Sequence, residues 1–132
     1  FSADGGVTFR GGTGYRFVTR GFHSGAGGTA FTDGSAGGAT INLVRNAATV
    51  SLGNAAGEHF NGVIYLFGAT NASLFTSSQG QITYNLSNAG EKAIMYTGGD
   101  YNVAEIHTTV RFQMDSGTIT SGTFVLYGLG AV

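Results

Sequence analysis

The chain of 132 residues is long enough for one domain with a hydrophobic core. Only 10% of its residues are charged and the formal net charge is −1, which argues against a nucleic-acid-binding domain with clustered Lys and Arg. Cysteine is absent, so disulfides and cysteine-based zinc sites are excluded. No apolar run approaches the roughly 20 residues of a membrane-spanning helix, so we expect no membrane insertion.

Glycine is the most unusual feature of the composition, with 24 residues, and proline is absent. The glycines follow no three-residue period, which excludes a collagen-like triple helix. A hydrophobic content of 42% excludes a simple flexible linker. We therefore expect many short turns between strands. Because the chain begins Phe1-Ser2 rather than with Met, we expect a processed product or a piece of a longer polypeptide.

The first 38 residues carry only short strand-like runs. Residues 5–10 and 14–20 are two such runs, and residues 24–38 contain many glycines with a single apolar pair, Ala30-Phe31. We predict that residues 1–38 form an extended, glycine-rich arm. Such an arm is a linker, a contact with another subunit, the end of a fibrous shaft or a mobile tail.

Regular strand patterns begin at Ala39, and we predict a β-sandwich domain over residues 39–132. Residues 39–44 and 47–52 flank an Arg45-Asn46 turn and predict a hairpin. Residues 60–68 carry large apolar side chains on both strand faces. This pattern predicts a strand buried on both faces and paired with the C-terminal strand.

Residues 81–86 alternate between the two faces of a strand. The predicted inward side chains are those of Ile82, Tyr84 and Leu86, and the predicted outward ones those of Gln81, Thr83 and Asn85. Shorter strands are predicted at residues 72–76 and 93–97. Gly98-Gly99-Asp100 has the composition of a tight turn.

The C-terminal part predicts two long strands around which the rest of the domain packs. Residues 101–114 alternate between apolar and polar side chains, and residues 123–127 are apolar on both faces. The predicted core comprises Ile64, Leu66, Ile106, Val110, Phe112, Phe124 and Leu126. The predicted polar face of the long strand comprises Glu105, His107 and Arg111.

About eight strands are thus expected between residues 39 and 128, at the spacing typical of sandwiches and barrels. No helical pattern of useful length is present. The predicted fold is all-β: an antiparallel β-sandwich, jelly-roll-like, with an extended glycine-rich N-terminal arm.

Groups that could carry catalysis are sparse, and we expect that the chain is not an enzyme. Glu58-His59 and the Glu105/His107 pair could each be a base with its orienting group, or part of a metal site. The same pairs are also ordinary on a solvated strand face. The acids Asp100, Glu105 and Asp115 are candidates for a glycosidase pair only by default.

We also expect no metal and no cofactor. The residues His23, His59 and His107 lack the spacing of a helical pair of metal ligands. The glycine run at residues 11–14 is followed by no Lys-Ser/Thr pair and opens no helix, so it is not a phosphate-binding loop.

Tyrosines give a stronger signal than ionisable groups. Sugar C–H faces stack on aromatic rings, while neutral amides and hydroxyls bond sugar hydroxyls. Tyr96, Tyr101 and Asn102 flank the predicted turn at Gly98-Gly99, where a site at a loop tip would be exposed. These three residues are the predicted ligand-binding site, although tyrosines are also common fillers of half-buried strand surfaces.

The ending at residues 121–128, SGTFVLYG, is a small-residue turn followed by a strand that closes in Leu-Tyr-Gly. It resembles a sequence that recurs near the C-termini of β-sandwich domains in bacteriophage structural proteins. The opening, with Val7-Thr8-Phe9 and Tyr15-Arg16-Phe17 set among glycines, is similar to the stem-to-head transition of phage tail fibres and spikes. The resemblance covers a minor part of the chain and carries over no catalytic residue.

The resemblance implies a virion surface protein, usually a homotrimer, whose C-terminal head stabilises the assembly or binds a host receptor or surface glycan. Contacts with other virion proteins follow from the same expectation. A carbohydrate-binding module of a secreted enzyme and a small hydrolase remain alternatives. Large side chains on the second face of residues 63–67 and 125–127 favour the oligomer, because a soluble monomer rarely exposes so large an apolar patch.

Overall fold

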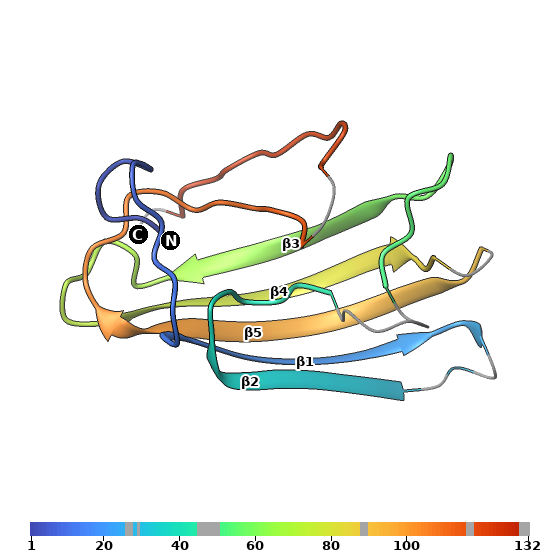
Figure 1. Cartoon of the computed structure of the whole chain (residues 1–132), viewed down its shortest axis with the longest axis horizontal. Coiled ribbons are helices and arrows are strands. Elements are labelled where there is room, and N and C mark those ends of the chain that lie inside the picture. Colours follow the sequence, from blue (N-terminus) through green and yellow to red (C-terminus); the bar gives the residue numbers. More distant parts are fainter. Residues whose placement is uncertain (26–27, 29, 45–50, 88–89, 116–117, 130–132) are drawn as a thin grey trace.

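The computed structural model describes residues 1–25, 28, 30–44, 51–87, 90–115 and 118–129. In this part of the chain, five strands form one antiparallel sheet in the order β2-β1-β5-β4-β3 (Figure 1). The strands are β1 (Tyr15–His23), β2 (Ala30–Gly38), β3 (Phe60–Phe67), β4 (Phe75–Asn85) and β5 (Lys92–Ala104). The prediction of an all-β, antiparallel fold is confirmed, and the structure shows a single sheet. No helix among the described residues has the length and apolar character needed to cross a lipid bilayer.

One face of the sheet is covered and carries the core. Residues 39–44 lie against this face, where the Thr97 hydroxyl donates a hydrogen bond to the carbonyl oxygen of Asn42. The buried cluster comprises Phe31, Ile82, Tyr84, Leu86, Ala93 and Met95, with Leu43, Val44 and Leu52 packed on it. The opposite face has no covering segment among the described residues and is called here the open face.

The alternation predicted for residues 81–86 is confirmed over most of its length. Ile82, Tyr84 and Leu86 are buried, while Gln81 and Thr83 are exposed on the open face. The prediction is wrong for Asn85, which is buried at the end of β4. Its side-chain oxygen accepts a long hydrogen bond, 3.4 Å, from the backbone N–H of His59.

The predicted turn at Gly98-Gly99 is wrong, because β5 runs through both residues without interruption. Gly99 pairs with Phe17 of β1 and with Ser78 of β4. A Cβ atom on Gly99 would lie 2.6 Å from the carbonyl oxygen of Arg16 and 3.1 Å from Cγ2 of Ile41. Glycine at this position therefore allows close packing between the sheet and the covering segment, rather than a change of chain direction.

The same kind of error divided β4 into two predicted strands, at residues 72–76 and 81–86. The structure has one strand, in which Gly80 pairs with Ile64 of β3. A Cβ atom on Gly80 would lie 2.7 Å from the carbonyl oxygen of Val63. Gly80 is thus a packing residue within a continuous strand.

The prediction of an extended N-terminal arm is wrong for residues 15–38, which form β1 and β2. β1 lies between β2 and β5, and its pairing with β5 joins Tyr15 to Tyr101 and His23 to Ala93. Sequence reasoning found too few nearby partners for these runs, because the partner strand lies some 80 residues further along the chain. Residues before β1 also contact the rest of the chain, since the buried Ser2 donates its backbone N–H to the carbonyl oxygen of Thr109.

The long strand predicted over residues 101–114 ends early, at Ala104. Beyond it, the described residues form no further strand, and Thr109 makes an isolated bridge with Ser2. The strand predicted at residues 123–127 is also absent, and this stretch joins no sheet in the described chain. β3 accordingly pairs with β4, so its predicted pairing with the C-terminal run is wrong.

Most of the predicted C-terminal core is exposed. Ile106 and Phe124 are exposed, the exposed fraction of Phe112 is 37%, and that of Leu126 is 86%. Val110, Ile64 and Leu66 are half-buried. The physical reason is that the chain leaves the sheet after Ala104, so the period-two pattern beyond it no longer meets a covered face.

Two further predictions concerned the burial of β3 and a hairpin around Arg45-Asn46. β3 is exposed on its second face rather than buried on both, because it is an edge strand with no covering segment there. Of the hairpin predicted around Arg45-Asn46, residues 45–50 lie outside the described residues, and residues 39–44 form no strand.

Candidate functional site

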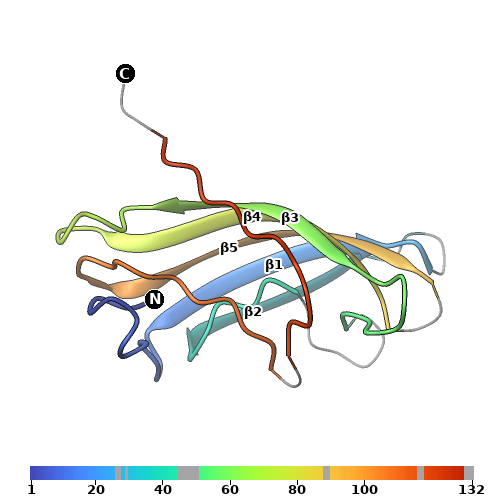
Figure 2. The ribbon, with the colours of Figure 1, turned by 90° about the horizontal axis from the view of Figure 1, so that it is seen from above.

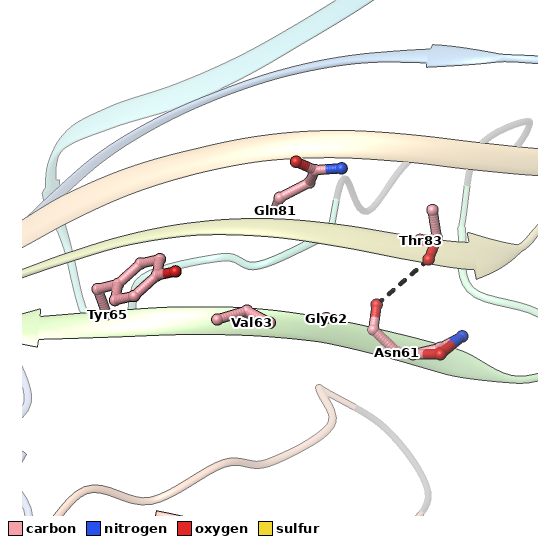
Figure 3. A pocket seen from close by; sticks show the side chains of 6 residues that line it. All are labelled: Asn61, Gly62, Val63, Tyr65, Gln81 and Thr83. Carbon is pink, nitrogen blue, oxygen red and sulfur yellow. Dashed lines mark hydrogen bonds between the residues drawn. The ribbon is translucent and has the colours of Figure 1, made fainter. Parts of the chain in front are cut away.

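The candidate site is a shallow hollow on the open face, between the edge strand β3 and its neighbour β4 (Figure 3). Its volume is about 540 Å³. The residues that line it are Asn61, Gly62, Val63, Tyr65, Gln81 and Thr83. All six are uncharged, and they supply an aromatic ring, two amides and a hydroxyl.

Strand pairing fixes the relative positions of these side chains. Val63 lies opposite Gln81, and Asn61 lies opposite Thr83. The Thr83 hydroxyl donates a hydrogen bond of 3.5 Å to the carbonyl oxygen of Asn61, which ties the two strands at one end of the hollow (Figure 3). Because the side chains project from paired strands rather than from loops, the sheet holds them in place.

Beside the hollow, the open face continues onto β5. Gln81 lies opposite Tyr96, and Tyr96 lies opposite Arg20 of β1. The exposed fractions of Tyr65 and Tyr96 are 50% and 51%, so both rings remain available to a ligand. Two exposed rings with amides between them suit a polyhydroxylated ligand, since rings stack on sugar C–H faces and amides bond hydroxyls.

The structure does not bring together the three residues predicted as the ligand site. Tyr96 lies on the open face, whereas Tyr101 is buried on the covered face, with its ring centroid 4.8 Å from that of Tyr15. Asn102 is exposed, and its backbone N–H donates a hydrogen bond of 2.9 Å to the carbonyl oxygen of Gly14. Tyr101 follows Tyr96 by five positions, and an odd offset places two side chains on opposite faces of one strand.

The lining residues Tyr65, Gln81 and Thr83 were missed as a site, although their outward positions carried a signal. The alternation in residues 81–86 and the second apolar face of residues 63–67 placed each of them on its face. The sequence pattern did not predict the pairing register of β3 and β4, which places Val63 opposite Gln81. Strand register depends on the whole sheet, and one strand's pattern cannot supply it.

A second cluster surrounds the buried His107, which was predicted to be on a polar, solvated face. Its Nδ1 lies 2.8 Å from the Thr76 hydroxyl, and its Nε2 lies 3.1 Å from a carboxylate oxygen of Glu105. Arg10 donates two hydrogen bonds to Glu105, of 2.7 and 2.6 Å. The prediction for His107 is wrong because residues after Ala104 turn back against the sheet, where the His107 N–H donates to the Ala69 carbonyl oxygen.

Burial and charge shift the pKa values of two groups in this cluster. Burial lowers the pKa of His107, an effect that the neighbouring Glu105 partly opposes. The hydrogen bonds from Arg10 lower the pKa of Glu105. A neutral imidazole between a hydroxyl and a carboxylate is the connectivity of a hydrolytic triad. Thr76 is 0% exposed, however, so its hydroxyl cannot reach a substrate, and the cluster instead joins residues 105–109 to the sheet.

The other candidate catalytic groups are dispersed. Glu58 accepts a hydrogen bond from the backbone N–H of Ala55, and the adjacent His59 is exposed. Asp100 forms an ion pair with Arg16 on the open face, and Asp115 is exposed. Arg111 stacks on Phe9, with its guanidinium carbon 4.2 Å from the ring centroid.

Metal-ligating groups are also apart in the residues that the structure describes. No three side chains of His, Cys, Asp or Glu come close enough there to hold a metal ion. His23 contacts Glu91 at 3.2 Å, at the end of β1.

Comparison with known proteins gives no match to a family model, to a curated protein sequence or to a solved structure.

Proposed function

We propose that this chain is a structural module of a bacteriophage fibre or spike, which contributes to virion assembly and binds a host receptor or surface glycan. The module acts on the virion surface, outside the host cell, as a homotrimer in contact with other virion proteins. The jelly-roll-like sandwich expected from the sequence belongs to this proposal, as a form completed in the assembly.

The observation that carries the proposal is the uncharged hollow on the open face. Tyr65 and Gln81 line the hollow, and the exposed ring of Tyr96 lies beside it on β5, opposite Gln81. No charged side chain lines the hollow, so it suits neutral hydroxyls better than phosphate or carboxylate groups. The ending SGTFVLYG supports the phage origin, because it resembles the C-terminal strands of phage structural proteins.

A carbohydrate-binding module of a secreted enzyme is the second candidate, since the same hollow favours it equally. The two candidates differ in assembly. A fibre or spike module is an obligate oligomer, whereas a binding module of an enzyme is usually a monomer.

Binding of purified bacterial cell-surface polysaccharides, measured by calorimetry, tests the proposal. We expect Tyr65→Ala and Gln81→Ala each to weaken binding by about tenfold or more, because each removes a group from the hollow. Thr32→Ala is the matched control, since Thr32 is exposed on β2, at the far edge of the sheet. Failure of the chain to bind any such polysaccharide or intact bacteria, or binding that both variants leave unchanged, would overturn the proposal.

The same samples test the expectation that the chain is not an enzyme. We expect polysaccharide chain lengths to stay constant after long incubation. Shortening that disappears in Glu105→Gln or in Glu58→Gln would contradict this expectation and favour a hydrolase.

A further inference from the structure

The outer edge of β3 is an unprotected sheet edge. β3 ends the sheet opposite β2, so one row of its backbone N–H and C=O groups has no strand beside it among the described residues. Its sequence, FNGVIYLF, contains no charged residue and no proline. Natural edge strands normally carry such residues, or bulges, which prevent pairing with another chain. An edge without these features is expected to be covered in the assembled protein.

The C-terminal segment, defined here as residues 124–129, is a stretch of strand-forming composition that joins no sheet in the described part of the molecule. Its sequence is FVLYGL, without charge or proline and with residues that favour β-structure. Its exposed large side chains are those of Phe124, Val125, Leu126, Tyr127 and Leu129. Within the described chain, the backbone of this segment joins no sheet. The Phe124 ring stacks on the Phe112 ring, and the two ring centroids are 5.4 Å apart.

The two features lie at the same side of the molecule. In Figure 2, the C-terminal segment, drawn in red, passes over β4 and β3 in this view and reaches beyond the β3 edge, away from β2. The segment crosses its own β3 instead of running alongside it. Its position therefore suits contact with a second molecule better than pairing within the chain.

We propose that residues 125–129 of one copy of this chain add as a sixth strand to the β3 edge of a second copy. The addition pairs the backbone groups of both strands, as in other cases of strand addition to a sheet edge. With the period of two, Val125, Tyr127 and Leu129 lie on the open face, beside Val63 and Tyr65. Leu126 lies on the covered face, beside the half-buried Ile64 and Leu66.

This contact joins a tail to an edge, and these are two different surfaces. Such head-to-tail contacts form closed rings when the rotation between copies is suitable. The number of three copies rests on the proposed function, whereas the pairing itself rests on the free outer edge of β3 and on the C-terminal segment, which joins no sheet in the described chain. The added strand also gives the hollow a second wall, because Val63 and Tyr65 line it from β3.

Disulfide trapping tests the contact directly, because the chain has no cysteine of its own. One full-length chain carries Val63→Cys, and a second chain, distinguished by a mass tag, carries Val125→Cys or Tyr127→Cys. Paired strands bring Cα atoms about 5.5 Å apart, which is within the range that a disulfide spans. The matched control replaces Val63→Cys with Thr32→Cys on the exposed β2 edge.

After the two chains are mixed and oxidised, we expect a tagged–untagged disulfide dimer with Val63→Cys, at least about tenfold more abundant than with Thr32→Cys. Equal yields, or no mixed dimer in any combination, would overturn the strand addition. Polysaccharide binding is measured on the untreated chain, so the two proposals fail separately. If the untreated chain binds glycan but the cysteine variants give no mixed dimer, the contact alone is overturned. If the cysteine variants form the mixed dimer but the untreated chain binds no glycan, the receptor function alone is overturned.

Discussion

The two edges of the sheet differ in charge, in glycine content and in the large apolar side chains that they expose. The edge strand β2 carries Asp33 and three glycines, and its large apolar residue, Phe31, is buried in the core. The edge strand β3 has no charge and exposes Val63, Tyr65 and Phe67. The composition of β2 is thus suited to a solvent-exposed sheet edge, whereas that of β3 is suited to pairing with a further strand. One sheet can therefore have one edge that remains in solvent and another edge that forms an interface.

The largest expected effect comes from a charge on the β3 edge. Val63→Lys would place an ammonium group against the added strand, where it loses solvent, so we expect the concentration needed for association to rise by more than about a hundredfold. Thr32→Lys on the β2 edge is the matched control and should leave association unchanged. Sedimentation velocity over a concentration series measures both variants. Equal effects of the two lysines would remove the distinction between the edges.

The next prediction separates the covered face of the sheet from its open face. Ile82 is buried within the core cluster, so Ile82→Ala should lower the free energy of unfolding by about 2–5 kcal/mol. Val18→Ala on the open face should change it by no more than about 0.5 kcal/mol. Urea unfolding of the two variants supplies the comparison. A loss below about 1 kcal/mol for Ile82→Ala would show that this face is not the core.

The third prediction concerns acid and the His107 cluster. The pKa of His107 is lowered by burial, so below its ordinary value of 6.5 the unfolded chain binds a proton that the folded chain does not. Hydrogen bonds from Arg10 lower the pKa of Glu105 from its ordinary value of 4.5. Near and below pH 4.5, the unfolded chain therefore also binds a proton on this carboxyl that the folded chain does not. Stability should therefore fall as the pH is lowered from 7 through 6 towards 4.

Replacing the imidazole isolates its share of this dependence. His107→Gln should make the fall between pH 7 and 5 shallower, measured as the urea midpoint at each pH. His59→Gln, at an exposed position, should leave the slope as it is. A slope unaffected by His107→Gln would contradict the buried, neutral state of this side chain.

The smallest effect is expected on the open face away from both edges, at the ion pair between Arg16 and Asp100. Its two hydrogen bonds measure 2.7 and 2.6 Å, but both side chains are partly exposed. A double-mutant cycle with Arg16→Gln and Asp100→Asn should give a coupling of about 0.2–1 kcal/mol that decreases with salt. A coupling above about 2 kcal/mol that is insensitive to salt would show that a partner covers this part of the face.

The difference between the edges also marks what the sequence could predict. The second half of β4 was predictable because Ile82, Tyr84 and the following Leu86 alternate with polar residues against a continuous core. β5 was divided in the prediction because Gly98 and Gly99 were interpreted as a turn. The reason for Gly99 lies in Arg16 and Ile41, which are distant in sequence and approach it only in the folded sheet.

The C-terminal stretch shows the converse limit. Its apolar composition predicts a strand, but the structure has none there, because a strand also needs a partner and the described chain offers none to residues 124–129. The candidate site has the same dependence on long-range register, since Tyr65 and Gln81 meet only through the pairing of β3 with β4. The predicted site at Tyr96, Tyr101 and Asn102 relied instead on nearness in sequence. Residues that are near in sequence on a strand can still point to opposite faces of the sheet.

The central claim is that the β3 edge and the C-terminal segment cover each other between copies of the chain. The most direct measurement is the mass of the unmodified, full-length chain by light scattering after size exclusion at micromolar concentration. The account predicts a closed oligomer of about 40 kDa, three times the 13.5 kDa of one chain. A single species of 13.5 kDa across the concentration range would contradict it.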